Sequence, residues 1–274
     1  MSERARDAGR SAAPAGKAGI SVPDKTVCLV CFASLGQLRP RHLGLLSAIE
    51  RARRDRYLRD DDRDRFALGA ALLRLLAGAI SGQAAAAVEV ERTCPRCGRP
   101  HGRPRLPGWS LHASVTHSGD VAGVAISAAG AVGIDLEAPA AGRVTALDAR
   151  QVATLDAHEG AAFDAGEVTA LWQAIRAPGE APLAGAAELR AIWTRKEAVL
   201  KATGVGLQLS MSRVRVSAAD REPALLSYDG REPPAASMLD LRPFPGYVGC
   251  VCVLSDGPVR FECVEAEALL SRCV

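Results

Sequence analysis

Three carboxylates and a lysine stand in two short stretches whose spacing could build a site for a cation and a phosphate. Residues 132–137 read Val-Gly-Ile-Asp-Leu-Glu, and this alternation predicts a strand with Asp135 and Glu137 on one face. In residues 192–207, Trp193, Glu197 and Lys201 recur at intervals of four, so a helix would place them along one flank. Two carboxylates on one strand face repel each other unless a positive charge lies between them. The pattern therefore favours a bound cation beside Asp135 and Glu137.

Magnesium suits these side chains, because a hard divalent cation binds a few carboxylates and keeps other positions for water and phosphate oxygens. Asp135, Glu137 and Glu197 would be the ligands of Mg²⁺, with Mn²⁺ as a substitute. A simpler interpretation stays open. The Asp-x-Glu sequence could be a solvated strand end, and Glu197 with Lys201 could be a helix-surface ion pair that stabilises the helix by roughly 0.2–0.5 kcal/mol.

The remaining periodicity predicts the elements that would position these groups. Ile192, Val199, Leu200 and Thr203 form an inward stripe on the helix, which Gly204 would end in the left-handed conformation. Residues 117–120 are expected to form a turn, and residues 178–185 a flexible insertion. Other expected helices span residues 42–58, 66–80 and 144–177. Expected strands span residues 27–32, 109–116, 121–127, 131–137, 214–216, 225–228, 238–241, 247–254 and 259–263.

Composition limits the classes of function. The chain has 274 residues, of which 48% are hydrophobic, so it can bury a full core. Its net charge of +3 is too mild to indicate nucleic-acid binding. No apolar run reaches the roughly 18 residues that a membrane span needs. Residues 1–23 lack the apolar core of a signal peptide and are expected to be a disordered tail, which predicts a cytoplasmic protein with reduced cysteines.

A second metal site is conceivable at residues 94–101, Cys-Pro-Arg-Cys-Gly-Arg-Pro-His. Cys94 and Cys97 have the spacing of half a zinc knuckle, and His101 could be a third ligand. A structural zinc site needs four ligands, and no second pair lies nearby in the sequence. A turn with two thiols is therefore favoured over a bound zinc. The other Cys-x-x-Cys, Cys28 and Cys31, lies inside an apolar run and is interpreted as two small buried hydrophobic residues.

Four pieces of the sequence, taken in order, resemble a known enzyme family. They are Gly-Arg-Pro at 102–104, Thr-His-Ser-Gly at 116–119, Gly-Ile-Asp-Leu-Glu at 133–137, and Trp-Thr-Arg-Lys-Glu-Ala-Val-Leu-Lys at 193–201. Together they resemble the 4′-phosphopantetheinyl transferase superfamily, specifically its larger, surfactin-synthetase-activating (Sfp-like) type. The similarity extends over about residues 27–263.

The resemblance implies a fold and an activity. The fold would be α+β, with two similar halves related by a pseudo-twofold axis. Each half would pack a small antiparallel sheet against a long helix, with the active site at the junction. The expected divisions are a tail at 1–23, halves at 24–138 and 139–264, and a tail at 265–274. The activity would be Mg²⁺-dependent transfer of 4′-phosphopantetheine from coenzyme A to a serine of an apo acyl or peptidyl carrier protein, with release of 3′,5′-ADP by a monomeric enzyme.

The resemblance also implies roles for residues. Asp135, Glu137 and Glu197 would hold Mg²⁺ against the pyrophosphate of coenzyme A. Glu197 would be the candidate base, with relay through a metal-bound water as the alternative. The residues implied at the phosphates are Lys201, Arg103, Thr116 and His117, with Arg65 at the 3′-phosphate and Arg53 as a weaker match to the same role.

Three other interpretations of the sequence compete with this one. A zinc-dependent nucleic-acid-binding module would need a second ligand pair and an excess of exposed basic residues, and the sequence offers neither. A Mg²⁺-dependent pyrophosphohydrolase of a nucleotide-like substrate could use the same carboxylates. An inactive family member that serves as a binding protein is disfavoured, because all the acidic ligands are present.

Overall fold

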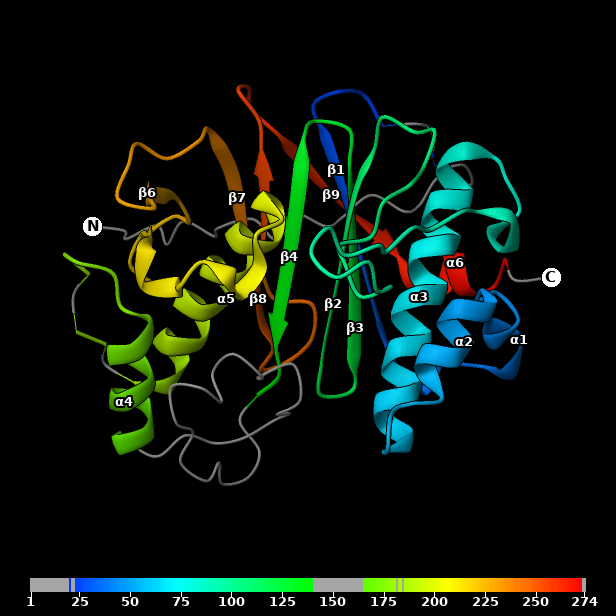
Figure 1. The fold of residues 1–274 in the computed structure, drawn as a ribbon, viewed down its shortest axis with the longest axis horizontal. Helices are drawn as coiled ribbons and strands as arrows, with labels where there is room; N and C mark the ends of the chain where they lie inside the picture. The colour runs from blue at the N-terminus through cyan, green and yellow to red at the C-terminus, as the bar shows by residue number, and fades with distance from the viewer. Residues whose placement is uncertain (1–19, 21–22, 140–164, 181, 184, 273–274) are drawn as a thin grey trace, which may run out of the picture.

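The computed structural model describes residues 20, 23–139, 165–180, 182–183 and 185–272. Two sheets pack face to face, and each carries one long helix on its outer face, which gives helix, sheet, sheet and helix in layers. Figure 1 shows the two long helices flanking the central strands, α3 on the right and α5 on the left. The expected tail at 1–23 lies almost entirely outside the described residues, as does most of the helix expected at 144–177.

In the described residues, three helices follow the first strand, three strands and two helices come next, and five strands precede the last helix. The helices are α1 (Pro40–Leu43), α2 (Ala48–Arg54), α3 (Asp60–Ser81), α4 (Ala165–Ile175), α5 (Ala186–Thr203) and α6 (Ala266–Leu270). The strands are β1 (Val27–Ser34), β2 (His112–Ser118), β3 (Val121–Ser127), β4 (Ala131–Glu137), β5 (Val214–Val216), β6 (Leu225–Tyr228), β7 (Ala236–Leu241), β8 (Val248–Leu254) and β9 (Arg260–Glu265). Short 3-10 turns lie at Leu35–Gln37, Ala85–Ala87, Gly206–Gln208 and Met211–Arg213.

The first sheet has the strand order β2-β3-β1-β9. Strand β1 pairs antiparallel with β3 and parallel with β9. Its side chains alternate between two cores, because successive residues of a strand point to opposite faces. Leu29 and Cys31 belong to the core under α3, whereas Cys28 and Val30 pack toward the second sheet. Both cysteines are fully buried, which confirms that they act as small hydrophobic residues.

The second sheet has the order β4-β8-β7, and all of its pairings are antiparallel. Val132, Ile134 and Leu136 of β4 face the first sheet, as their alternation predicted. Gly133 lies on the other face, against α5. A Cβ atom there would stand 2.0 Å from the carbonyl oxygen of Ala198, so only glycine lets the helix approach β4 this closely. This contact fixes the distance between α5 and the strand that carries Asp135 and Glu137.

A row of hydroxyl groups joins the two sheets where β2 runs beside β4. Ser114, Thr116 and Ser118 alternate along β2 and are all buried. The Ser114 hydroxyl accepts a hydrogen bond from the Ile134 amide at 3.1 Å, and the Ser118 hydroxyl accepts one from the Ala138 amide at 3.0 Å. The two serine hydroxyls thus accept hydrogen bonds from backbone amides of β4 and of the residue that follows it, which would otherwise need backbone partners. This row of hydroxyl groups places β2 beside Asp135 and Glu137 of β4.

Several boundaries differ from the sequence-based prediction. The charged run that begins at Asp60 is the first turn of α3, because acidic side chains are favourable at a helix N-terminus. The helix expected at 42–58 is two shorter helices, α1 and α2. His117 lies inside β2, and the turn begins only at Gly119, whose φ is 55°. Gly204, with φ of 77°, ends α5 in the left-handed conformation, as predicted.

Two strand pairings cross the boundary that was expected between the two halves of the chain, at residues 138 and 139. Strand β4, expected in the first half at 24–138, pairs with β8 and therefore belongs to the second sheet. Strand β9, expected in the second half at 139–264, crosses back and pairs with β1. Helix α6, expected as part of a C-terminal tail, packs in the core under α3. Long-range strand pairing of this kind leaves no signal in local periodicity.

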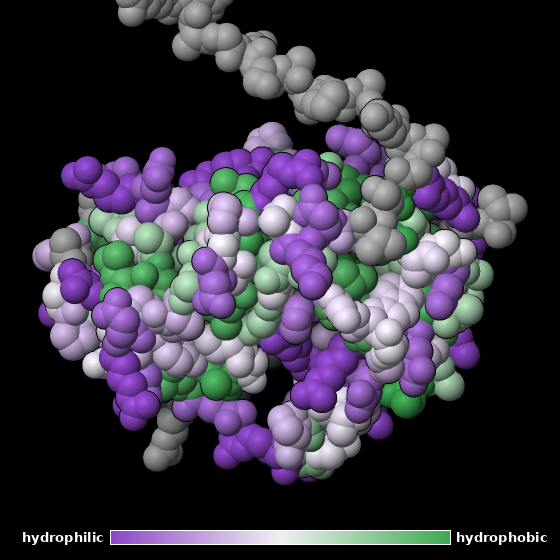
Figure 2. All heavy atoms as spheres, turned by 90° about the horizontal axis from the view of Figure 1, so that it is seen from above, coloured by the Kyte–Doolittle hydropathy of each residue, from purple (hydrophilic) through white to green (hydrophobic). Residues whose placement is uncertain are grey.

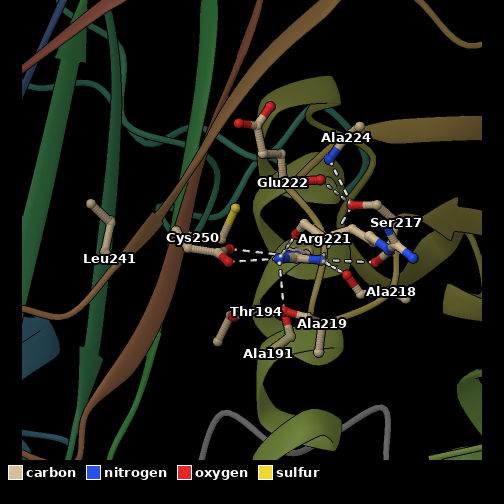
Figure 3. Close-up of polar contacts among 12 residues, drawn as sticks. Ala191, Thr194, Ser217, Ala218, Ala219, Arg221, Glu222, Ala224, Leu241 and Cys250 are labelled. Atoms are coloured by element: carbon tan, nitrogen blue, oxygen red, sulfur yellow. Dashed lines mark hydrogen bonds and ion pairs between the residues drawn. The ribbon is translucent and has the colours of Figure 1, made fainter. Parts of the chain in front are cut away.

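Two buried cations anchor α5. The Arg195 side chain is fully buried and donates to the carbonyl oxygens of Ser217, Ala218 and Arg221 at 2.9, 2.7 and 2.8 Å. Figure 3 shows these three residues gathered beside α5. Arg195 also pairs with Asp240 of β7 at 2.6 Å. Helix α5 is thus fixed both to its own sheet and to the loop that follows β5.

Lys196 is the second anchor, and it corrects the prediction of a flexible insertion at 178–185. Its ammonium group is buried and donates to the Glu180 carboxylate and to the Ile175 carbonyl oxygen, at 2.8 and 2.7 Å. Glu180 also accepts hydrogen bonds from the amides of Ala177 and Val216. The described part of this segment is therefore tied to α5 through Glu180, a tertiary contact that a Pro- and Gly-rich composition does not reveal.

Glu180→Gln should lower the free energy of unfolding by roughly 3–5 kcal/mol, because it leaves the Lys196 charge buried without its counter-ion. The side chains of Lys196 and Glu180 are 0% and 6% exposed, so water cannot replace the lost partner. Urea denaturation of the two proteins measures the difference. Glu222→Gln, at an exposed position, is the matched control and should change stability by less than about 0.5 kcal/mol. Equal stability of Glu180→Gln and the wild type would contradict the anchor.

Within the described residues, none of the helices combines the length and apolar character that crossing a membrane requires.

Candidate functional site

A large cleft lies between the two halves of the molecule, with a volume of about 1470 Å³. Both halves contribute polar and charged residues to the lining of this cleft. The first half contributes Arg53, Arg92, Arg103, Thr116 and His117. Strand β4 and helix α5 contribute Asp135, Glu137, Trp193, Glu197 and Lys201. Figure 2 shows the molecule indented between its halves, with hydrophilic side chains gathered at the indentation. Of the residues to which the family resemblance assigns a role, Arg65 alone does not line the cleft.

Asp135 is the most deeply buried of the acidic residues in the cleft, with 5% of its surface exposed. Its Oδ1 atom accepts a hydrogen bond from the Lys201 ammonium at 2.6 Å and a longer one from the Thr116 hydroxyl at 3.4 Å. Its Oδ2 atom is buried and has no hydrogen-bond partner. A buried carboxylate oxygen without a partner is costly, and a bound cation would relieve that cost.

Glu137 lies two residues along the same face of β4, where burial raises the pKa of its carboxyl group to about 8. The nearby charges of Asp135 and Glu197 raise this pKa further, while the Ser118 hydroxyl at 3.3 Å and the Lys201 charge oppose the rise. Burial likewise raises the pKa of Asp135, and the charge of Lys201 opposes that shift. The single positive charge of Lys201 therefore does not bring the pKa values of Asp135 and Glu137 back to their ordinary range.

This donor set fits a divalent cation. Three carboxylates line one cleft, one of them has an unpartnered buried oxygen, and the charges of Asp135 and Glu197 help to raise the pKa of Glu137. Oxygen ligands of this kind suit Mg²⁺ or Mn²⁺, which also keep coordination positions for phosphate oxygens. Asp135, Glu137 and Glu197 are the residues that would hold the ion.

The raised pKa of Glu137 predicts a pH-dependent stability when divalent cations are removed. The carboxyl group stays protonated in the folded protein up to about pH 8, whereas in the unfolded chain it ionises near its ordinary value of 4.5. The contribution of Glu137 to the free energy of unfolding is therefore fully present below about pH 4.5. This contribution decreases as the pH rises from 4.5 toward 8 and does not change further above pH 8. Thermal melts in chelator at pH 5.5 and pH 8 should show this loss, and the loss should be smaller in Glu137→Gln.

Addition of Mg²⁺ should raise the melting temperature more at pH 8 than at pH 5.5, because the cation binds the ionised carboxylates. The exposed-site variant Glu222→Gln should behave like the wild type at both pH values. If Glu137→Gln and the wild type lose stability equally between the two pH values, Glu137 is not the group that titrates.

The α5 flank carries the other charged groups of the site. Trp193, Glu197 and Lys201 are all partly buried and all line the cleft, so the spacing of four placed them correctly. Lys201 reaches across to β4, where it donates to the carbonyl oxygen of Ile134 at 3.2 Å as well as to Asp135. The ammonium group of Lys201 is therefore part of the carboxylate cluster, as well as a helix-surface charge.

Two arginines in the cleft carry buried N–H groups without hydrogen-bond partners. Arg103 donates one Nη1 hydrogen bond to the Ala202 carbonyl oxygen at 2.9 Å, but its Nη2 atom has no partner. The Nε atom of Arg92 is likewise buried and unpartnered, and burial together with the charge of Arg53 lowers the pKa of this guanidinium to about 10. Guanidinium groups in this condition suit an anion with several oxygens, such as a phosphate.

Arg65 is the exception among the basic candidates. Its side chain is 3% exposed, pairs with Asp62 at 2.6 Å, and donates to the Gly119 carbonyl oxygen at 2.5 Å. These contacts hold the β2–β3 turn against α3 and keep the guanidinium out of the cleft lining. Arg53, the weaker match, does line the cleft and stacks on Phe66 at 5.1 Å. The structure therefore favours Arg53 over Arg65 as an anion-binding residue.

Thr116 and His117 are neighbours in β2 and point to opposite faces, as adjacent strand residues do. Thr116 is buried and bonds to Asp135, so its hydroxyl helps to hold the carboxylate. His117 is exposed and lines the cleft. Its imidazole is thus the member of the pair that a ligand can reach.

Sequence reasoning overlooked three contributors to this site. Ser114 and Ser118 complete the hydroxyl row with Thr116, and their spacing of two was readable as one strand face. Arg92 offered less signal, because it precedes the expected strand and stands alone in a loop. Its importance comes from the fold, which buries its guanidinium in the cleft.

Comparison with known families gives one match. Residues 131–252 match the model of the 4′-phosphopantetheinyl transferase superfamily. This stretch runs from β4 to β8 and includes Asp135, Glu137, Glu197 and Lys201. Over these residues the chain is similar to the 4′-phosphopantetheinyl transferase superfamily. No curated protein matches the chain in sequence.

Proposed function

We propose that the protein is a transferase of the Sfp-like type, which moves 4′-phosphopantetheine from coenzyme A to a serine of an apo acyl or peptidyl carrier protein. One observation carries the proposal most directly. The cleft combines a cluster of carboxylates that has an unpartnered Asp135 oxygen with two arginines that have unpartnered N–H groups. A cation held by the carboxylates, together with a pyrophosphate held by the arginines, would satisfy both kinds of group.

In the proposed reaction, the serine oxygen of the carrier attacks the phosphorus atom that bears the pantetheine arm. A new phosphorus–oxygen bond forms, the bond to the bridging pyrophosphate oxygen breaks, and 3′,5′-ADP leaves with that bonding pair. The bound Mg²⁺ would supply charge stabilisation on the pyrophosphate oxygens. The other contributions come from side chains in the cleft.

Glu197 accepts the serine proton in this scheme. It lies on α5, and Arg195 and Lys196 anchor this helix before the substrates bind. Lys201 counters the charge of Asp135 and adds positive charge near the phosphates. Arg92, Arg103 and His117 hold the phosphate groups from the first half of the molecule, while Arg53 is available for the 3′-phosphate.

The experiment incubates the protein with coenzyme A, Mg²⁺ and a panel of apo carrier proteins from fatty-acid, polyketide and nonribosomal-peptide pathways. The proposal expects one carrier to gain the mass of phosphopantetheine at its serine, with equal release of 3′,5′-ADP. Release of 3′,5′-ADP without any carrier would support the pyrophosphohydrolase instead. The absence of both products with every carrier would overturn the proposal.

Arg103→Lys should raise the KM for coenzyme A by about tenfold, because lysine keeps the charge but loses the second N–H group for the phosphate. The kcat should change less, since the substituted group binds the substrate in its ground state as well as in the transition state. Steady-state kinetics with a saturating carrier separates the two constants. The control is Arg221→Lys, whose side chain is exposed and outside the cleft lining. An unchanged KM in Arg103→Lys would remove this residue from the phosphate site.

A further inference from the structure

A second group of metal-binding side chains lies in the loop between α3 and β2. The Sγ atoms of Cys94 and Cys97 and a ring nitrogen of His101 all lie within 4.8 Å of one another. The closest pair is Cys97 Sγ and His101 Nε2, at 2.9 Å. Tetrahedral zinc at its usual bond lengths would hold such atoms roughly 3.5–3.8 Å apart, so shifts of about 1 Å would complete the site.

We propose that Cys94, Cys97 and His101 bind one zinc ion, with water in the fourth position, and that this zinc holds the loop carrying Arg92 and Arg103. The sequence alone disfavoured zinc because a fourth protein ligand was missing. The structure favours zinc more strongly, because it places His101 Nε2 at 2.9 Å from Cys97 Sγ and all three ligand atoms within 4.8 Å of one another. Three protein ligands and one water form a normal zinc coordination.

The backbone of the loop is already folded around the cluster. The Cys94 amide donates to the Arg99 carbonyl oxygen at 2.9 Å, and the Gly98 amide donates to the Cys94 carbonyl oxygen at 2.9 Å. Gly98 has a φ of 68°, which suits glycine at the tight turn after the second cysteine. The backbone turn within this loop therefore places His101 beside the two cysteines, and no second pair of cysteine or histidine ligands is needed to do so.

The surroundings of Cys94 differ from those of the cysteines in the cores. Backbone amides of Arg96 and Cys97 donate to the Cys94 sulfur, and the Arg96 guanidinium lies near it. Such hydrogen bonds stabilise a thiolate, which is the form of cysteine that binds zinc. Cys28, Cys31, Cys250 and Cys252 are instead fully buried among apolar side chains.

The loop connects the proposed zinc to the phosphate-binding arginines. Arg92 lies two residues before Cys94, and Arg103 two residues after His101. The Gly102 amide donates to the Arg92 carbonyl oxygen at 2.6 Å, so the two ends of the loop lie side by side. A Cβ atom at position 102 would stand 2.8 Å from the Thr93 carbonyl oxygen, so glycine is needed for this approach. A zinc ion at the tip would restrain both guanidinium groups through short segments of backbone.

The test measures metal in the purified full-length protein and then uses cobalt(II) as a spectroscopic probe. We expect about one zinc per chain after purification without chelators. Replacement by cobalt should give the intense near-ultraviolet absorption of a cobalt–thiolate bond together with visible bands of a tetrahedral ion. Cys94→Ser, Cys97→Ser and His101→Ala should each lose or alter these bands. Cys263→Ser, at an exposed cysteine outside the cluster, should keep them.

Asp135→Asn should also keep the cobalt–thiolate bands, because carboxylates do not produce them. This variant separates the zinc site from the proposed transferase site, so either proposal can fail alone. Absence of zinc in the wild type together with absence of thiolate bands after cobalt addition would overturn the zinc site. So would bands that survive Cys94→Ser and Cys97→Ser, or a Cys94–Cys97 disulfide found by mass spectrometry in freshly purified protein.

Hydrogen exchange of the wild-type protein tests the restraining role without any substitution that could prevent folding. Removal of zinc by a chelator should increase amide exchange in residues 92–103 by about tenfold or more, while β1 and β8 stay protected. Mg²⁺ is kept in excess so that the carboxylate site is unaffected. Loss of zinc with no change of exchange in residues 92–103 would show that the ion does not hold the loop.

Discussion

Asp135→Asn is expected to lower the rate of phosphopantetheine transfer by about 10³-fold or more. The substitution keeps the shape of the side chain but removes the negative charge that binds both Lys201 and the proposed cation. Metal-assisted stabilisation of a phosphoryl transition state is worth several kcal/mol, and about 4 kcal/mol corresponds to 10³-fold in rate. The rate is measured with saturating coenzyme A, carrier and Mg²⁺, so that weaker substrate binding does not hide the result.

A direct measurement of metal binding accompanies the kinetics. Titration of the wild-type protein with Mn²⁺, followed by electron paramagnetic resonance, should show one tight site whose affinity is lost in Asp135→Asn. The control is Asp220→Asn, because Asp220 is exposed and lies outside the cleft lining. Wild-type activity in Asp135→Asn, or Mn²⁺ binding that does not depend on Asp135, would refute the metal site.

The local features of this site were predictable from the sequence because they depend on short periods. Alternation in residues 132–137 correctly placed Val132, Ile134 and Leu136 on one face and Asp135 on the other. Intervals of four placed Trp193, Glu197 and Lys201 on one flank of α5. In both cases the backbone geometry of one element fixes which side chains share a face, so no tertiary information is needed.

The contacts between elements were not predictable in the same way. Whether Lys201 meets Asp135 depends on how closely α5 approaches β4, which the absence of a side chain at Gly133 permits. The burial of Arg92 and the removal of Arg65 from the cleft depend on the loop after α3 and on the β2–β3 turn. Each of these outcomes rests on residues distant in sequence, and a charge pattern does not show which partner a given arginine will find.

Glu197 and Lys201 allow the sharpest separation of catalysis from helix stability. If they were an ordinary helix-surface pair, Glu197→Gln and Lys201→Ala would each cost a few tenths of a kcal/mol in stability and nothing in rate. In the proposed mechanism, each variant should lower kcat by about 10²-fold or more, the scale of one general base or one electrostatic contact. Exposed-site controls are Glu222→Gln and Lys25→Ala, which should keep the wild-type rate.

The structure adds a difference between the two variants. Lys201 neutralises the buried charge of Asp135, so Lys201→Ala should also raise the pKa of Asp135 and lower the melting temperature at pH 8. Glu197→Gln relieves repulsion among the carboxylates and should leave the melting temperature unchanged or slightly higher. Thermal melts in chelator at pH 8 distinguish these outcomes before any activity is measured.

The double variant completes the test. Glu197 and Lys201 act on the same transition state, so their effects should not multiply, and the double variant should retain more activity than the product of the two single losses predicts. The measurement is kcat for the wild type, both single variants and the double variant with a saturating carrier. If both single variants keep near-wild-type rates, the pair is an ordinary surface ion pair. In that case Glu197 is not the general base, Lys201 does not stabilise the phosphates, and the proposed transferase mechanism is wrong.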